Sequence, residues 1–277
     1  MWLSLAFLSA FLLGCYEVCK KKSLDNNAVI PVLFLNTCFC SLLFLPCIVL
    51  SYGFPEFMRN SLFYVPLSTG HEHIYIIGKA ALVLTSWTCA YFATKHLPIT
   101  IAGPIKASQP ILTLVGALLI FGEQLNLYQW IGVILAIVFI VPAPISGAAS
   151  GFYEQYLMSH GFDRMTVQVW YSYYQMAMMT VILFVLWYPK RKHTTPFVWK
   201  PSIFFISLFL VCADFVYFYA LSYPDSMISI VSMVRRSSVV VSFIAGAFLF
   251  REKNIRSKSF DLILVLLGMF FLYLGTK

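Results

Sequence analysis

Long apolar runs alternate with short polar breaks along the whole chain of 277 residues. Most runs are long enough for a bilayer-crossing helix, because about 20 residues at about 1.5 Å each span a hydrocarbon core of about 30 Å. The pattern predicts ten helices, at residues 2–19, 28–51, 75–95, 99–121, 128–141, 145–160, 165–188, 201–222, 226–250 and 257–275. We therefore expect an all-α integral membrane protein with ten transmembrane helices.

Composition agrees with this fold class, since 60% of the residues are hydrophobic and 11% are charged. The net charge of +8 falls mostly in the expected loops, so it favours no nucleic-acid partner. The seven cysteines include no Cys-x-x-Cys pair, and His71-Glu72-His73 lies in an expected exposed loop with alternate spacing. We expect no metal and no cofactor. No catalytic motif such as Gly-x-Ser-x-Gly or His-Glu-x-x-His occurs, so the sequence does not favour an enzyme.

The second half of the chain repeats features of the first. Three pairs of segments carry the similarity: 14–17 with 151–154, Tyr91-Phe92 with Tyr217-Phe218, and 106–123 with 235–252. In the last pair, Lys106 aligns with Arg235 and Glu123 with Glu252. Internal repeats of this kind are typical of secondary transporters. They predict one five-helix repeat at 1–142 and a second at 143–277.

Two repeats with an odd number of spans must lie in opposite orientations in the membrane. The loops after the first, third, seventh and ninth helices hold 12 of the 19 lysines and arginines, against 3 on the opposite side. By the positive-inside rule, the basic loops are expected in the cytoplasm and both termini outside.

Three cations interrupt otherwise apolar helices. Lys106 lies eight residues beyond Pro98, and Arg235 lies nine residues beyond Ser226. These spacings place them roughly 12 and 14 Å from opposite membrane faces. A charge near the bilayer centre is costly and usually faces a bundle interior or an aqueous cavity. The third cation, Arg236, points about 100° around the helix from Arg235.

Asp214 is expected at a similar depth, so a structural ion pair with one arginine is an alternative to substrate binding. Three cations against one carboxylate leave about two positive charges, which favours an anionic substrate. Arginine suits this role because its planar fork binds phosphate or carboxylate with two hydrogen bonds.

Several other residues are candidates for lesser roles. Tyr91 and Tyr217 combine a ring with a hydroxyl and could line a substrate cavity, although aromatic residues in such a chain are more often packing. Glu17 and Glu154 are repeat-related and are candidates for proton coupling. Glu17, next to Lys20, can instead be a solvated helix end. Lys79 lies five residues into its helix and is expected to reach the interface.

Taken together, the spans, the inverted repeat and the helix-end glutamates Glu123 and Glu252 resemble the drug/metabolite transporter superfamily, of the EamA-like type. Within that superfamily, Lys106 followed by Pro110 and the stretch 235–242 resemble the sugar-phosphate translocators. The resemblance implies that Lys106, Arg235 and Arg236 bind a substrate phosphate. Arg235 replaces a lysine of that pattern, and Gln109 stands where a glutamate is common.

The sequence thus predicts a secondary transporter that moves a small organic anion, favouring a phosphorylated metabolite, by alternating access around a basic midplane site. The alternative is a broad exporter of amino acids or other metabolites whose basic residues are structural. A membrane enzyme acting on lipid phosphate and a purely structural subunit are less favoured. We expect a lipid bilayer and a small-molecule substrate as partners, a monomer or homodimer, and a bacterial inner membrane as location.

Overall fold

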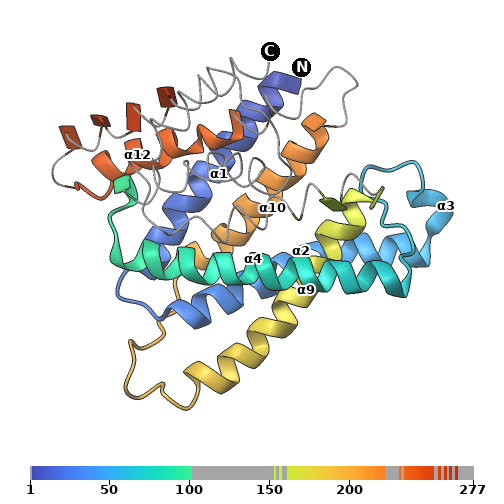
Figure 1. Ribbon diagram of the computed structural model, residues 1–277, viewed down its shortest axis with the longest axis horizontal. Coiled ribbons are helices and arrows are strands. Elements are labelled where there is room, and N and C mark those ends of the chain that lie inside the picture. The colour runs from blue at the N-terminus through green and yellow to red at the C-terminus, as the bar shows by residue number, and fades with distance from the viewer. Residues whose placement is uncertain are drawn as a thin grey trace, which may run out of the picture.

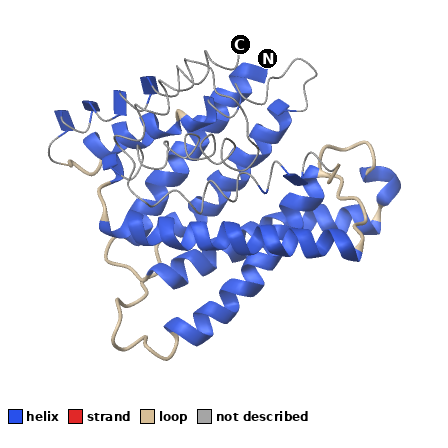
Figure 2. Ribbon diagram, in the orientation of Figure 1, coloured by secondary structure: helices blue, strands red, loops and turns tan. Residues whose placement is uncertain are grey.

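The computed structural model describes most of the chain, and every structural statement below concerns the described part: residues 2–101, 153, 156–157, 161–221, 231, 234–252, 255–256, 259–260, 262–263 and 266–267. Within these residues, the regular elements are all helices (Figure 2). Their bounds are α1 Trp2–Leu24, α2 Val29–Gly53, α3 Pro55–Met58, α4 Gly70–His96, α9 Arg164–Ile182, the π-helix Leu183–Trp187, α10 Ser202–Leu221 and α12 Ser238–Phe248.

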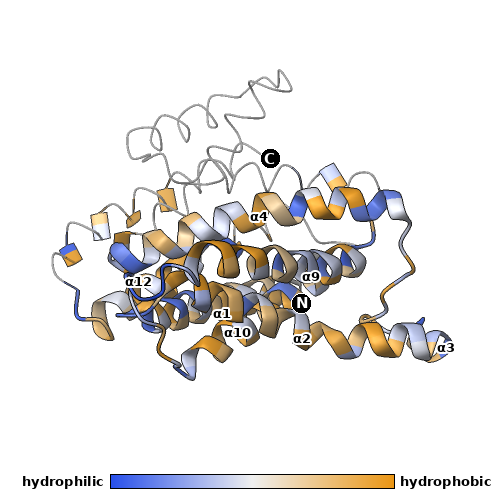
Figure 3. Cartoon of the chain, turned by 90° about the horizontal axis from the view of Figure 1, so that it is seen from below, coloured by the Kyte–Doolittle hydropathy of each residue, from blue (hydrophilic) through white to orange (hydrophobic). Residues whose placement is uncertain are grey.

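Five described segments are long and apolar enough to cross a membrane: Leu3–Leu24, Val29–Gly53, Gly70–His96, Arg164–Trp187 and Ser202–Ala220. They match the expected first, second, third, seventh and eighth helices. Hydrophobic residues dominate these helices, and hydrophilic residues gather at helix ends and loops (Figure 3). The other five expected helices fall wholly or partly outside the described residues.

Local capping corrects one expected boundary. The third helix begins at Gly70 rather than near residue 75, because Thr69 and Glu72 form a capping box. The Thr69 N–H donates to Glu72 Oε2 at 2.6 Å, which satisfies a backbone group that the helix start would leave unpaired. His71 and His73 therefore lie in the first turn of α4 and not in a loop.

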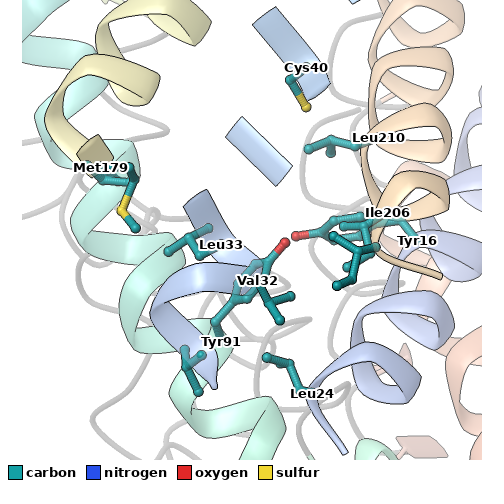
Figure 4. Close-up of a cluster of buried hydrophobic side chains, with 12 residues drawn as sticks. Tyr16, Leu24, Val32, Leu33, Cys40, Tyr91, Met179, Ile206 and Leu210 are labelled. Carbon is teal, nitrogen blue, oxygen red and sulfur yellow. The ribbon is translucent and has the colours of Figure 1, made fainter. Parts of the chain in front are cut away.

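Neighbouring pairs among the five membrane-length helices form a closed series of contacts, which we call the ring, and α2 also contacts α4 and α1. α1 packs against α10, α10 against α2, α2 against α9, α9 against α4, and α4 against α1 (Figure 1). The main core lies inside this ring and takes one or more buried side chains from each helix, including Tyr16, Leu33, Tyr91, Met179 and Ile206 (Figure 4). The ring therefore encloses side chains that are far apart in the sequence.

α12 packs against α1 at a very close approach of the two backbones. A Cβ atom added to Gly14 would lie 2.6 Å from Cγ1 of Val241. Small residues permit such contacts between membrane helices. Gly14 thus brings the stretch that follows the two arginines against the first helix.

Candidate functional site

Arg235 lies just before α12 and contacts two side chains of α10. Its Nη2 atom donates a hydrogen bond to Oδ1 of Asp214 in an ion pair. Its guanidinium also lies over the ring of Tyr217, 4.4 Å from the ring centre. Asp214 and Tyr217 are three residues apart on α10, so they occupy one face of that helix. The sequence-predicted pairing of Asp214 with one arginine is present.

This arginine cluster, which we define as Arg235, Asp214 and Tyr217, lies near the middle of the membrane. Asp214 is twelve residues beyond Ser202, or about 18 Å along α10, in a core about 30 Å thick. The side chains of Arg235 and Asp214 remain 19% and 15% exposed. The cluster is therefore deep in the span but not sealed.

Arg236 differs from Arg235 in its contacts. Among the described residues, no carboxylate forms an ion pair with it. The expected continuous ninth helix is interrupted directly after it, since Ser237 forms a turn and α12 begins at Ser238. The N-terminus of α12 has no side-chain cap. Backbone hydrogen bonds continue across the turn, from the Ser237 N–H to the Val234 carbonyl at 3.0 Å and from the Val240 N–H to the Ser237 carbonyl at 2.9 Å.

A second cation cluster, the lysine cluster, consists of Lys20, Glu17, Tyr16 and Tyr91. Lys20 and Glu17 form an ion pair within α1, with side chains 1% and 13% exposed. The Lys20 ammonium lies 4.8 Å from the ring centre of Tyr16 and 5.4 Å from that of Tyr91. The hydroxyl groups of the two tyrosines point toward each other (Figure 4).

The lysine cluster corrects two expectations. Lys20 was expected in a basic loop, but α1 extends to Leu24 and buries it. Glu17 is not a solvated helix end, because its partner is this buried lysine. The hydrophobic pattern ended the first helix at residue 19, since three consecutive lysines follow. The aromatic rings and Glu17 compensate the charge of the first of them, which lets the helix continue.

Lys79 is also buried, with 3% of its surface exposed, whereas it was expected to reach the interface. Its ammonium lies 5.0 Å from the ring centre of Tyr171 on α9. At this buried position between α4 and α9, the ring of Tyr171 stabilises the ammonium charge that water would stabilise at the interface.

Four of the basic loops meet at one end of the ring, as the loop-charge pattern predicts. Hydrogen bonds connect them pairwise: Lys21 Nζ to Leu97 O at 2.6 Å, Lys95 Nζ to Thr195 Oγ1 at 2.8 Å, Lys200 Nζ to Asp25 O at 2.6 Å, and the Ile99 N–H to Glu252 Oε1 at 2.7 Å. Glu252 also accepts hydrogen bonds from Thr100. We call this end the loop face.

Glu252 caps the start of a helix at the loop face. Its carboxylate accepts two backbone N–H groups at the start of the helix that follows Pro98. A carboxylate at this position satisfies groups that have no partner within the helix. A glutamate singled out from the sequence as a helix-end motif therefore ties the end of α12 to the first half of the chain.

The ring interior also holds neutral polar side chains that the sequence analysis missed. Asn36, Ser41, Ser172, Gln175 and Ser207 are all buried. Ser41 Oγ donates to the carbonyl of Ser172 at 3.0 Å, and Ser207 Oγ donates to Asn36 Oδ1 at 2.9 Å. A signal was present, because single amides inside long apolar runs are costly in a bilayer unless they face the bundle interior.

The predicted binding residues separate into groups. Tyr217, Arg235 and Asp214 come together, with Arg236 next in the chain, whereas Tyr91 belongs to the lysine cluster. Lys106 and Glu154 lie outside the described residues. Tyr91 and Tyr217, the tyrosines of the predicted repeat, thus each lie against a cation, in two different clusters.

Comparison with known proteins adds one finding. A family model described as the EamA-like transporter family matches residues 1–142 and 145–274. A search of the curated proteins found no match.

Proposed function

The chain belongs to the EamA-like transporter family, and from this premise we propose that it is a secondary transporter of a small organic anion, with phosphorylated metabolites as the favoured class. Membership of the family makes the protein a membrane transporter of small molecules. The substrate class and the mechanism are our proposal. The two stretches that match the family, of similar length, support two five-helix repeats and alternating access between them.

One observation carries the proposal: two adjacent arginines lie deep in the span, and among the described residues one carboxylate, Asp214, forms an ion pair there, with Arg235. Asp214 compensates Arg235, which leaves the charge of Arg236. A net positive site near the bilayer centre is costly unless an anion occupies it for part of the transport cycle. Lys106, if it reaches the same depth, would increase the surplus.

The pairing of Arg235 with Asp214 suggests how the empty site is stabilised. Asp214 holds the guanidinium in place while no substrate is bound. An incoming anion competes with this carboxylate for the fork of Arg235, and it gains Arg236 as well. Phosphate suits this geometry because its oxygens can accept from two guanidinium groups at once. The likeness of 235–242 to the sugar-phosphate translocators supports the same class, while the family match itself stops at EamA-like transporters.

The remaining predicted roles stay secondary. Glu17 is engaged by Lys20, which favours an ion-pair role for it over proton coupling. Glu154 remains a candidate for coupling. A bacterial inner membrane and a monomeric or dimeric state also remain predictions.

Ligand-dependent thermal stability of the purified protein tests the proposal. A ligand that binds the folded state raises the melting temperature. Phosphorylated, carboxylated and cationic metabolites should be compared for the wild type and for the double variant Arg235→Gln, Arg236→Gln. The matched control is Arg191→Gln, because Arg191 also lies over a tyrosine ring, at 4.3 Å from the centre of Tyr188, but is exposed outside the ring of helices.

We expect phosphorylated compounds to stabilise the wild type and the control but not the double variant. Asp214→Asn should bind them more tightly, by about tenfold, since it removes the internal competitor. If neutral or cationic compounds stabilise all variants alike and phosphorylated compounds stabilise none, the arginines are structural. The broad exporter of amino acids or other metabolites then becomes the better description.

A further inference from the structure

Three buried amides have a polar atom without a partner among the described residues: Asn36 and Gln175 have an unpaired donor, and Gln168 has an unpaired acceptor. Asn36 on α2 and Gln175 on α9 are 0% and 1% exposed. Within the described residues, Asn36 Nδ2 and Gln175 Nε2 have no hydrogen-bond partner. A buried N–H group without a partner lowers folding stability, so its presence calls for an explanation.

Asn36 is held firmly by its other groups. Ser207 Oγ on α10 lies 2.9 Å from Asn36 Oδ1 and 3.1 Å from the Asn36 carbonyl oxygen. These contacts fix the side chain while leaving one amide atom available. Turning the amide by 180° would exchange the nitrogen and the oxygen and would again leave one of them unpaired.

Gln175 lies at the same level of the bundle. α2 and α9 run antiparallel, since Phe44 packs with Val169 and Leu33 belongs to the same cluster as Met179. Ser41 meets Ser172 between these two contacts. Gln175, three residues beyond Ser172, is therefore level with the turn of α2 that contains Asn36.

Asn27 shows how this chain treats an amide whose role is structural. Its Nδ2 donates to the carbonyls of Ser23 and Val198 at 3.0 and 2.7 Å. Its Oδ1 accepts from the N–H groups of Ala28 and Val198 at 2.8 and 2.9 Å. Every polar atom of Asn27 is used to join α1 to the segment before α10. Asn36 and Gln175, in contrast, each have an amide nitrogen without a hydrogen-bond partner among the described residues.

We propose that Asn36 and Gln175 form a hydrogen-bonding subsite for the neutral polar part of the transported molecule, its hydroxyl or carbonyl oxygens. This inference rests on the proposed function, because it assigns a second half to the same substrate. Amide N–H groups donate to such oxygens, and donors kept unpaired until a ligand arrives discriminate strongly against ligands that lack the matching acceptor.

The subsite and the arginine cluster are within reach of one small molecule. Ser207, which contacts Asn36, and Asp214, which contacts Arg235, lie seven residues apart on α10. Two helical turns correspond to about 10 Å, the length of a small phosphorylated metabolite. The anionic end would meet the arginines, and the hydroxylated end would meet the two amides. The substrate class becomes a hydroxylated organic anion and not an anion with an apolar tail.

Isosteric apolar substitutions separate a recognition role from a structural one. The variants are Asn36→Leu and Gln175→Met, with Asn27→Leu as the matched control. Gln175→Met removes an unpaired donor and should leave the melting temperature unchanged or raise it. Asn36→Leu also removes the acceptor of the Ser207 hydroxyl, which keeps the Asn36 carbonyl oxygen at 3.1 Å, so any loss of stability should be smaller than for Asn27→Leu. Removing the fully bonded amide of Asn27 should lower the melting temperature by about 5 °C or more.

Binding is measured by the shift in melting temperature with inorganic phosphate, ethyl phosphate, glycerol 3-phosphate and glucose 6-phosphate. We expect the wild type to prefer the two hydroxylated phosphates over ethyl phosphate. Asn36→Leu and Gln175→Met should each weaken the binding of the hydroxylated compounds by about tenfold. The affinity for inorganic phosphate and ethyl phosphate should stay unchanged. The inference is overturned if the preference for hydroxylated compounds survives both substitutions, or if Asn36→Leu and Gln175→Met lose stability as Asn27→Leu does.

Glycerol and glucose, which carry hydroxyl groups without a charge, keep this result distinct from the test of the proposed function. If no phosphorylated compound binds the wild type, the anion proposal fails. In that event, stabilisation of the wild type but not of the two amide variants by glycerol or glucose still supports the subsite. No such stabilisation overturns it.

Discussion

The lysine cluster and the arginine cluster use the same ingredients in different arrangements. Each combines a cation, a carboxylate and one tyrosine of the predicted repeat pair, Tyr91 in one and Tyr217 in the other. Lys20 pairs with Glu17 three residues away on the same helix, whereas Arg235 pairs with Asp214 on another helix. The lysine is 1% exposed and the arginine 19%.

This difference indicates which cluster can take part in transport. An ion pair within one helix stays intact when helices move relative to one another. A pair between two helices can separate when they move, and its cation is then available to a substrate anion. The turn at Ser237 lies next to Arg235 and Arg236, so the arginine cluster also lies at a local break in the helix. Broken helices near the midplane are frequent at transporter binding sites.

The largest expected effect on folding stability comes from breaking the ion pair of Lys20 and Glu17 in the lysine cluster. Glu17→Gln removes the carboxylate that pairs with the buried Lys20, which should cost about 3–5 kcal/mol of folding stability. Asp214→Asn should cost less, about 1–2 kcal/mol, because the side chains of Arg235 and Asp214 are only partly buried, at 19% and 15% exposed. Thermal unfolding of the purified variants measures both.

The double variant Glu17→Gln, Lys20→Met is the control for this comparison. It removes both charges, so most of the lost stability should return. Equal losses for Glu17→Gln and Asp214→Asn would mean that the two clusters do not differ in the way that their exposure indicates.

Much of the fold followed from the hydrophobic pattern alone. Five described helices occupy expected spans, and the basic loops meet at one face, because membrane insertion forces backbone groups into helices and sorts charge to the loops. The ion pair of Asp214 with one arginine was also foreseen as an alternative, from depth and charge balance.

The misses have two causes. Lys20 and Lys79 were assigned to loop and interface because their burial depends on Tyr16, Tyr91 and Tyr171, aromatic rings contributed in part by other helices. Such tertiary contacts override a local pattern. The start of α4 depends instead on the capping box of Thr69 and Glu72, a local signal that a count of apolar residues does not read, and the turn at Ser237 is likewise not detected by such a count.

Exchanging the cations should give a smaller effect that sharpens the comparison. Lys20→Arg forces a larger group into a closed site between two rings and should cost about 2 kcal/mol through overpacking. Arg235→Lys keeps the charge in a more open site and should cost about 1 kcal/mol or less. It should nevertheless weaken binding of phosphorylated compounds by about tenfold, since the two-bond fork is lost.

Unfolding and ligand-shift measurements on the two variants test this pair of outcomes together. A stability loss for Arg235→Lys as large as that for Lys20→Arg would make the arginine a packing residue. Retained affinity for phosphorylated compounds in Arg235→Lys would show that charge alone, and not the guanidinium fork, recognises the anion.

The smallest expected effect concerns the tyrosine hydroxyls. Both Tyr91→Phe and Tyr217→Phe keep the ring that lies against the cation, so cation–π attraction should survive in each. Tyr91→Phe removes a buried hydroxyl that has no hydrogen-bond partner among the described residues, so folding stability should stay unchanged or rise by up to about 1 kcal/mol. Tyr217→Phe should stay within about 0.5 kcal/mol of the wild type, because its ring still lies against Arg235 in a partly exposed cluster. Thermal unfolding of the two single variants, each compared with Tyr188→Phe, whose ring lies under the exposed Arg191, measures both effects. A stability loss for Tyr217→Phe of more than about 1 kcal/mol would mean that the arginine cluster is as closed as the lysine cluster, and would remove the reason for placing the anion at Arg235.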